Sequence, residues 1–170
     1  MKIMADKRNV FITGSSSGIG RRLLDEFCRD EFRVFATVRQ PRLKAFQESL
    51  KGKYSNVIPF VLDVTNLDEG TEVIRTVENK YGPIDILINN AGISYRTVVE
   101  EMSEPDEAIQ MATNYLGPMH LVRMVLPGMR QKKSGHIINI SSVGGMMAMP
   151  TMSAYSASKF ALEGASESLW

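Results

Sequence analysis

Five short apolar runs alternate with segments whose apolar residues recur at helical spacing, and this alternation constrains the fold of the 170-residue chain most strongly. Apolar runs of about four to eight residues bounded by turn signals are typical of buried strands, and apolar residues three and four apart are typical of helices. Continuous apolar strands separated by helices predict an α/β fold, a doubly wound parallel sheet with helices on both faces. The expected strands are residues 9–13, 33–38, 57–62, 84–88 and 136–140, and the expected helices are residues 19–30, 42–50, 67–81, 106–130 and 153–170.

Pro59 and Pro118 each fall inside one of these elements. Pro59 cannot donate a ladder hydrogen bond, so we expect it at the start of its strand or on a non-bonding edge. Pro118 should kink or split the helix over residues 106–130. We find no internal linker, repeat or low-complexity segment, which predicts a single domain over residues 1–170.

Composition argues against several classes of protein. A net charge of +1 gives no electrostatic basis for binding nucleic acid or an anionic membrane. No apolar run approaches the roughly 18 residues that span a bilayer, and no signal peptide precedes the first strand. The single cysteine, Cys28, excludes an internal disulfide and is expected to be a buried, inert thiol. His120 and His136 lack a third ligand in register, so no metal site is predicted. We expect a soluble, cytoplasmic protein.

The segment Thr13-Gly-Ser-Ser-Ser-Gly-Ile-Gly20 joins the first expected strand to the first expected helix, as a dinucleotide-binding turn would. Gly14 would permit the tight turn, Gly18 the approach of a pyrophosphate, and Gly20 the close packing of the helix. The N–H groups at the start of a helix, together with its dipole, favour bound phosphate. A turn that serves packing alone is the alternative. The predicted cofactor-binding residues here are Gly14, Ser16, Ser17, Gly18, Ile19 and Gly20.

The end of the second expected strand indicates which nicotinamide cofactor is used. Enzymes that use NAD place an acidic residue here for the ribose hydroxyls, whereas a 2′-phosphate is held by arginine. This chain has Val38 at the acidic position, followed by Arg39, whose guanidinium can bind phosphate bidentately. NADP(H) is therefore the preferred cofactor and NAD(H) the second candidate, although Arg39 could also be a solvated loop residue.

Tyr155 and Lys159 lie four residues apart in the last expected helix, so their side chains share one face. A phenol with a pKa near 10 is a poor acid or base at neutral pH, and a neighbouring cation favours the phenolate. This pair predicts a group that donates or accepts a proton in a reaction.

Taken together, these motifs resemble the short-chain dehydrogenase/reductase family. The residues that carry the resemblance are the Thr13–Gly20 turn, Asn89-Asn-Ala-Gly92, Asn114, the Ser142 region and Tyr155-x-x-x-Lys159, in the family's order over essentially the whole chain. The resemblance implies a Rossmann-type fold and an oxidoreductase that transfers a hydride between nicotinamide and a carbonyl or alcohol.

The resemblance also assigns roles to residues. Tyr155 would be the general acid or base, and Lys159 would lower its pKa and hold the nicotinamide ribose. Ser142, with Ser141 as the second candidate, would bind the substrate oxygen, and Asn114 would anchor a water in a proton relay. The remaining cofactor contacts would come from Asp63 and Val64 at the adenine and from Asn90, Ala91, Gly92, Tyr155 and Lys159 along the cleft.

Members of this family continue beyond the catalytic helix with further strands and a substrate-binding loop. We therefore expect a chain that lacks the last strands of the family fold, and a catalytically inactive NADP(H)-binding fragment is the alternative function. Methionines at 146, 147, 149 and 152 could form an apolar wall for a hydrophobic substrate or could simply pack a loop. The family also suggests a homodimer or homotetramer.

Overall fold

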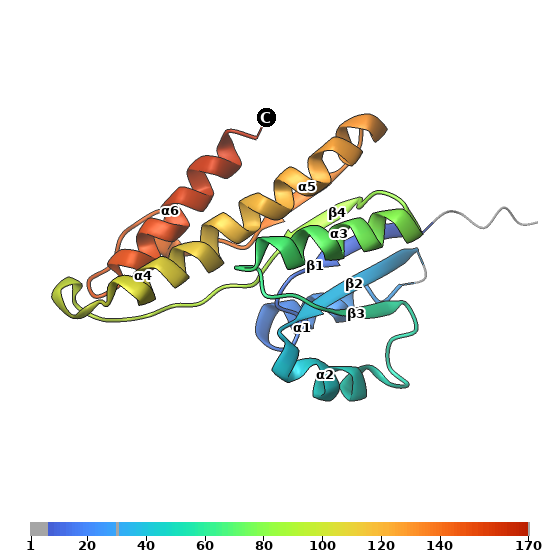
Figure 1. Cartoon of the computed structure of the whole chain (residues 1–170), viewed down its shortest axis with the longest axis horizontal. Coiled ribbons are helices and arrows are strands. Elements are labelled where there is room, and N and C mark those ends of the chain that lie inside the picture. The colour runs from blue at the N-terminus through green and yellow to red at the C-terminus, as the bar shows by residue number, and fades with distance from the viewer. Residues whose placement is uncertain (1–6, 30, 170) are drawn as a thin grey trace, which may run out of the picture.

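The computed structural model describes residues 7–29 and 31–169, and a five-stranded parallel sheet forms its centre (Figure 1). The strands are β1 (Arg8–Ile12), β2 (Phe32–Val38), β3 (Val57–Val61), β4 (Ile86–Asn89) and β5 (His136–Asn139). They lie side by side in the order β3-β2-β1-β4-β5, and all four pairings are parallel. The direction of winding reverses between β1 and β4, which opens a crevice at the carboxyl ends of these strands. The predicted doubly wound architecture is confirmed.

Helices cover both faces of the sheet. One face is covered by α3 (Leu67–Tyr81) and α5 (Gly117–Lys132), and the other by α1 (Gly18–Glu26) and α2 (Leu43–Leu50) (Figure 1). Leu24 of α1 and Phe46 of α2 join one apolar cluster with Val10, while Ile74 of α3 and Leu121 of α5 join a second cluster with Phe11. Val10 and Phe11, which are neighbours in β1, thus pack into the clusters on opposite faces of the sheet. Burying each such side chain contributes about 1.5–3 kcal/mol.

The region predicted as one helix over residues 106–130 is interrupted by a wide turn. It consists of α4 (Glu104–Met111), a π-helical turn η3 (Ala112–Leu116) and α5. Ser103 caps α4 by accepting a hydrogen bond from the backbone of Asp106. Pro118 follows the π turn as the second residue of α5 and has no N–H to donate to the carbonyl four residues earlier, that of Asn114. The expected disruption at Pro118 is therefore confirmed, and it takes the form of a π bulge.

The last helix, α6 (Ser153–Glu167), packs against α4 and the π turn and projects with α4 to the left of the sheet in Figure 1. Three short 3₁₀ turns complete the fold: η1 (Gln40–Arg42), η2 (Val99–Glu101) and η4 (Val143–Gly145). The predicted end of the last helix, residue 170, lies outside the described residues.

Two predictions about single residues have opposite outcomes. Pro59 lies in the edge strand β3, in register with Ala36, as its missing N–H requires. Cys28 was predicted to be buried, and this is wrong: α1 ends at Glu26, two residues earlier, so the thiol lies in the following turn and is exposed.

Candidate active site

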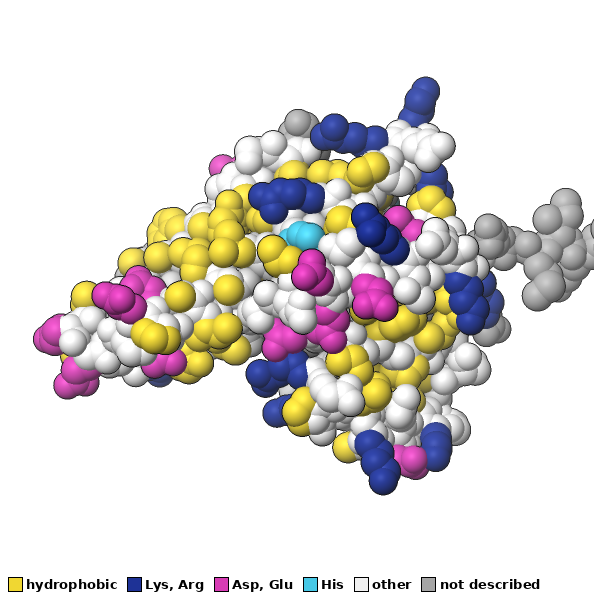
Figure 2. Space-filling model, viewed as in Figure 1, with side chains coloured by type: hydrophobic (Ala, Val, Ile, Leu, Met, Phe, Trp, Pro, Cys, Tyr) yellow, Lys and Arg dark blue, Asp and Glu magenta, His cyan; other side chains and the backbone are white. Residues whose placement is uncertain are grey.

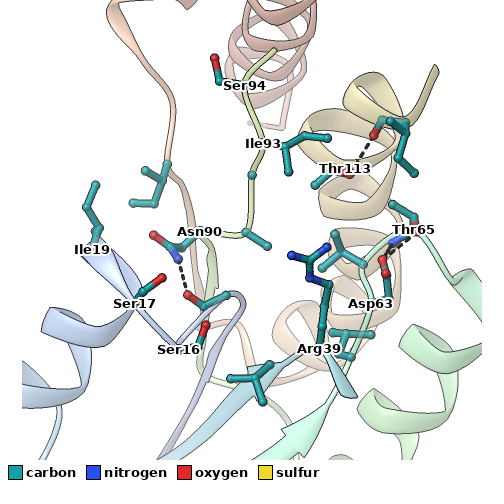
Figure 3. A pocket seen from close by; sticks show the side chains of 18 of the residues that line it. Ser16, Ser17, Ile19, Arg39, Asp63, Thr65, Asn90, Ile93, Ser94 and Thr113 are labelled. Carbon is teal, nitrogen blue, oxygen red and sulfur yellow. Dashed lines mark hydrogen bonds between the residues drawn. The ribbon is translucent and has the colours of Figure 1, made fainter. Parts of the chain in front are cut away.

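A pocket of about 600 Å³ opens at the carboxyl ends of the strands, above the point where the winding reverses (Figure 3). Its walls come from the turn after β1, the ends of β2 and β3, the segment after β4, and α6. The predicted cofactor residues that line it are Gly14, Ser16, Ser17, Ile19, Arg39, Asp63, Val64, Asn90, Ala91, Gly92, Tyr155 and Lys159. The fold thus brings together side chains from nearly the whole length of the chain.

The turn after β1 depends on two glycines. Gly14 has a φ of 69°, and a Cβ there would lie 2.9 Å from the Cα of Ala91. A Cβ at Gly20 would lie 2.4 Å from the Gly14 carbonyl oxygen and 2.5 Å from Nδ2 of Asn90. Ser17 is the N-cap residue of α1, yet its side chain makes no capping hydrogen bond, which leaves the hydroxyl able to bind a ligand at the helix N-terminus.

Asn90 ties this turn to the segment that follows β4. Its Nδ2 donates to the carbonyls of Thr13 (2.9 Å) and Gly14 (3.1 Å). In return, Thr13 Oγ1 accepts hydrogen bonds from the backbone N–H groups of Asn90 and Ala91, both at 3.0 Å. Sequence reasoning missed Thr13, which holds the two halves of the pocket together. The available signal was its position directly before Gly14, at the end of β1.

Charged side chains gather where β2 and β3 end. Figure 3 shows the Arg39 guanidinium reaching into the pocket from the end of β2. Arg42, from the η1 turn, also lines the pocket and donates to Ser16 Oγ at 3.4 Å, a contact that no sequence pattern predicts. At the end of the neighbouring strand β3, Asp63 accepts hydrogen bonds from the backbone and the hydroxyl of Thr65, at 3.0 and 2.7 Å. The pocket therefore carries two cations and a fixed carboxylate at this edge.

Tyr155 and Lys159 face the pocket from the first turns of α6. The ammonium of Lys159 lies 5.9 Å from the centre of the Tyr155 ring and donates to the Ile140 carbonyl at 2.8 Å. Lys159 is buried, and this burial lowers the pKa of its ammonium, while the nearby Glu163 carboxylate opposes the shift. The helical spacing of the pair is as predicted.

Asn114 lies behind the pocket wall, inside the π turn. Its side chain binds both backbone groups of Ile93, accepting from the N–H and donating to the carbonyl at 2.9 Å each, and it also donates to Ser158 Oγ at 3.0 Å. A Cβ at Gly92 would lie 3.3 Å from Asn114 Oδ1 and 3.8 Å from Lys159 Nζ. Asn114 thus links the segment after β4 to α6 and approaches the lysine.

The two adjacent serines after β5 have different surroundings. Ser142 Oγ accepts a hydrogen bond from the backbone N–H of Gly144 at 3.1 Å, and Ser142 does not line the pocket. Ser141 does line it, and its buried Oγ has no hydrogen-bond partner within the described part of the chain. Of the other predicted site residues, Gly18, Gly20 and Asn114 also lie outside the pocket lining.

Two predicted absences can be compared with the structure. Within residues 7–29 and 31–169, no group of three or more His, Cys, Asp and Glu side chains is placed to hold a metal ion. No helix in the same residues is long and apolar enough to cross a membrane.

Comparison with known proteins identifies the family. Residues 8–170 match the family model for short chain dehydrogenases. The 3-ketodihydrosphingosine reductase of Bacteroides thetaiotaomicron is 39% identical over 160 residues, which cover 94% of this chain and 56% of that protein. Oxidoreductase BOA17 of Botryotinia fuckeliana is 37% identical over 154 residues, 91% of this chain and 56% of its own length. The chain thus spans little more than half the length of these curated relatives.

Solved structures agree. A short-chain dehydrogenase from Streptomyces avermitilis superposes with a TM-score of 0.90 at 35% identity, over 96% of this chain and 59% of that one. ElxO with NADP bound gives a TM-score of 0.87 at 33% identity, over 94% and 65% of the two chains. With sequence, fold and family model in agreement, this chain belongs to the short-chain dehydrogenase family.

Proposed function

We propose that the chain carries the cofactor site and proton-transfer residues of an NADP(H)-dependent oxidoreductase that acts on carbonyl or alcohol groups. The observation that carries the proposal is that Tyr155 and Lys159 line the same pocket as the glycine turn at Gly14. One pocket therefore offers a phosphate-binding helix N-terminus and a proton donor, and a nicotinamide bound between them would supply or accept the hydride.

The chain's own residues would manage the proton. During reduction, Tyr155 donates its hydroxyl proton to the substrate oxygen as negative charge develops there. Ser142 Oγ donates a hydrogen bond to the same oxygen and stabilises that charge. Lys159 holds the cofactor ribose, and Asn114 anchors a water through which the proton of Tyr155 is replaced from solvent. The approach of Asn114 and Lys159 around Gly92 supports this relay.

A preference for the phosphorylated cofactor is supported by the cations at the end of β2. Arg39 reaches into the pocket, and Arg42 is fixed beside Ser16. Val38, where NAD enzymes have an acid, offers no carboxylate to the ribose. Among the similar structures, ElxO and an actinorhodin polyketide ketoreductase are described with NADP and NADPH bound.

We further propose that the substrate has an apolar body. Val143, Met146 and Met147 follow the proposed catalytic serine directly and are 63%, 80% and 60% exposed. Flexible apolar side chains of this kind adapt to hydrophobic ligands. Lengthening the alkyl chain of a ketone series should lower KM, whereas a KM that is independent of chain length would contradict this part of the proposal.

The catalytic assignment is tested by Tyr155→Phe, measured as NADPH oxidation with a panel of carbonyl compounds. Loss of the proton donor should reduce turnover by about 10²–10⁴-fold, while the other cofactor residues of the pocket still bind NADPH. Tyr95→Phe is the matched control, because Tyr95 lines the same pocket and has no assigned catalytic role. Turnover that survives Tyr155→Phe would exclude Tyr155 as the acid.

Cofactor preference is tested by Arg39→Ala. A charge-assisted hydrogen bond contributes about 1.5–3 kcal/mol, so the dissociation constant of NADPH should rise by about 10–100-fold. The dissociation constant of NADH should stay unchanged, because NADH lacks the 2′-phosphate. An equal loss for both cofactors would contradict the proposed phosphate contact.

A second candidate function is NADP(H) binding without catalysis. It is favoured by one observation, that Ser142, the proposed donor to the substrate oxygen, does not line the pocket. Binding alone predicts that NADPH at 100 times its dissociation constant raises the free energy of unfolding by about 2.7 kcal/mol through mass action. The unfolding temperature should rise with it, and no carbonyl should be turned over.

We also propose a homodimer. Figure 2 shows hydrophobic side chains gathered over the arm that holds α4 and α6, and the exposed apolar residues of this region include Ile109, Leu116 and Phe160. A two-fold pairing would bury the same face of both copies.

A further inference from the structure

Gly144 lies between the two side chains proposed to bind the substrate oxygen, Ser142 and Tyr155. Its backbone N–H donates to Ser142 Oγ at 3.1 Å. On its other side, a Cβ would lie 3.2 Å from Cε1 and 3.3 Å from Cδ1 of the Tyr155 ring. We infer that Gly144 fixes the Ser142 hydroxyl and the Tyr155 ring relative to each other and is a positioning residue for the proposed hydride transfer. This inference rests on the proposed function.

The hydrogen bond from Gly144 determines how Ser142 can act. A serine hydroxyl has one hydrogen to donate and two lone pairs to accept with. The Gly144 N–H occupies one lone pair, so the hydroxyl hydrogen cannot point at Gly144 and is available to another acceptor. Ser142 is therefore prepared as a donor, which is the role that a substrate carbonyl oxygen needs.

The missing side chain of Gly144 determines where the Tyr155 ring can lie. A methyl group added at residue 144 would lie closer to the Tyr155 ring than the roughly 3.5–4.0 Å of an ordinary carbon contact. Gly144 is buried, and Ser156 Oγ, 3.5 Å from the same Cβ position, closes the space further along α6. A methyl group at residue 144 must therefore displace the ring by a few tenths of an ångström.

The backbone conformation of Gly144 does not itself require glycine. The glycines of the described residues with positive φ are Gly14, Gly18, Gly52 and Gly82, and Gly144 is not among them. Alanine can adopt the same backbone and keeps the N–H that binds Ser142. The substitution Gly144→Ala therefore changes one contact, that with the Tyr155 ring.

The turn approaches α6 at its next residue as well. The Gly145 N–H donates to the Ser142 carbonyl at 2.9 Å, and a Cβ at Gly145 would lie 3.1 Å from the Lys159 carbonyl oxygen. The 3₁₀ turn and the helix that carries Tyr155 thus pack closely at two successive residues.

The experiment compares Gly144→Ala with Gly164→Ala in the full chain. Gly164 is exposed on α6, the helix that carries Tyr155. No atom lies within 4 Å of its Cβ position, which makes it a matched control. Gly144→Ala should lower kcat by about tenfold or more, because small misplacements of a catalytic group are costly. The NADPH dissociation constant and the thermal midpoint should stay near their wild-type values. Gly164→Ala should leave kcat and the NADPH dissociation constant unchanged and should raise the thermal midpoint slightly, because alanine is the better helix former.

A double-mutant cycle separates positioning from structural damage. In a Tyr155→Phe background, Gly144→Ala should cause much less than its tenfold loss, since it acts through the tyrosine hydroxyl. Equal losses in both backgrounds would overturn the inference. A fall in kcat accompanied by matching losses of thermal midpoint and NADPH affinity would also overturn it, because Gly144 would then be structural.

The inference remains testable if the wild-type chain binds NADPH without turnover, the result that would refute the proposed catalysis. The ¹³C ring resonances of Tyr155, assigned by their loss in Tyr155→Phe, report the ring position directly. Gly144→Ala should shift these resonances and Gly164→Ala should not. Unmoved Tyr155 resonances in Gly144→Ala would overturn the inference whether or not the chain is active.

Discussion

Lys159 is a buried cation: it is 6% exposed, and its ammonium donates to the Ile140 carbonyl. Burial lowers its pKa from the ordinary 10.5. Between the lowered pKa and 10.5, the unfolded chain therefore binds more protons than the folded chain does. The free energy of unfolding must then rise with pH across this interval.

We predict that the ¹³Cε resonance of Lys159, assigned by its loss in Lys159→Met, titrates with a midpoint below 10.5. Lys159→Met should also remove the contribution of Lys159 to the rise of the unfolding free energy with pH. Urea unfolding at a series of neutral to alkaline pH values measures this change. A titration midpoint at or above 10.5 would contradict the effect of burial described here.

At the residue scale, the sequence was most informative where one local pattern requires one local geometry. The i and i+4 spacing was enough to place Tyr155 and Lys159 on one face of α6, and the strand–turn–helix context was enough to place Gly14 at the pocket. Thr13 and Arg42 were missed because their contacts join segments that are distant in sequence. Cys28 was misplaced because its burial depended on where α1 ends, which is the least predictable property of a helix.

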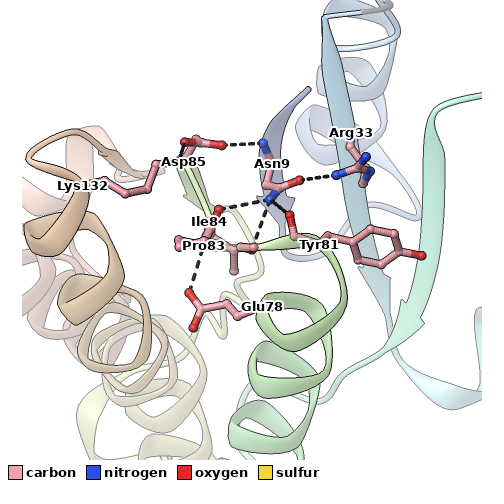
Figure 4. Close-up of polar contacts among 9 residues, drawn as sticks. Asn9, Arg33, Glu78, Tyr81, Pro83, Ile84, Asp85 and Lys132 are labelled. Carbon is pink, nitrogen blue, oxygen red and sulfur yellow. Dashed lines mark hydrogen bonds and ion pairs between the residues drawn. The ribbon is translucent and has the colours of Figure 1, made fainter. Parts of the chain in front are cut away.

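At the element scale, the end of α3 is held by Asn9, at the opposite end of the sheet from the pocket (Figure 4). Asn9 Nδ2 donates to the carbonyls of Tyr81 (2.8 Å), Gly82 (3.1 Å) and Pro83 (3.1 Å), and its Oδ1 accepts from Arg33. The side chain of Asn9 in β1 thus binds the carbonyl of the last residue of α3 and those of the two residues that follow it.

We predict that Asn9→Ala lowers the free energy of unfolding by about 1–3 kcal/mol, because it removes the partner of several partly buried polar groups. Asn9→Asp should be more destabilising, since a carboxylate cannot donate to these carbonyls and Asp85 lies close by. Urea unfolding measures both, and NADPH affinity should not change. A loss below about 0.5 kcal/mol for both variants would show that Asn9 does not hold this end of α3.

The order and type of the elements could be predicted because the apolar period distinguishes a strand from a helix over a few residues. The form of the interruption before Pro118 could not be predicted in the same way. A missing N–H predicts a kink, a split or a bulge equally well, and the side-chain contacts of Asn114 with Ile93 and Ser158 accompany the π turn that formed. These partners come from the segment after β4 and from α6, which no local pattern connects to residue 114.

At the scale of the whole molecule, the proposed homodimer predicts that a charge on the exposed face of α4, η3 and α6 separates the copies. Leu116→Glu with Phe160→Glu should shift the sedimentation coefficient from dimer to monomer, since a buried unpaired carboxylate opposes association. Leu67→Glu is the control, because Leu67 is similarly exposed, at 46%, but lies at the start of α3. A wild-type chain that sediments as a monomer would refute the dimer.

The central position of β1 has a consequence for how the molecule folds. β1 pairs with β2, which follows it closely along the chain, and also with β4, where Val10 is in register with Ile86. Closing a long loop is entropically costly, so local pairings should form before distant ones. Strands β1 to β3, with α1 and α2, should therefore gain protection in pulse-labelled hydrogen exchange before β4 and β5. The residues of α6 proposed to transfer the proton, Tyr155 and Lys159, would then reach the glycine turn late in folding, after that turn is in place.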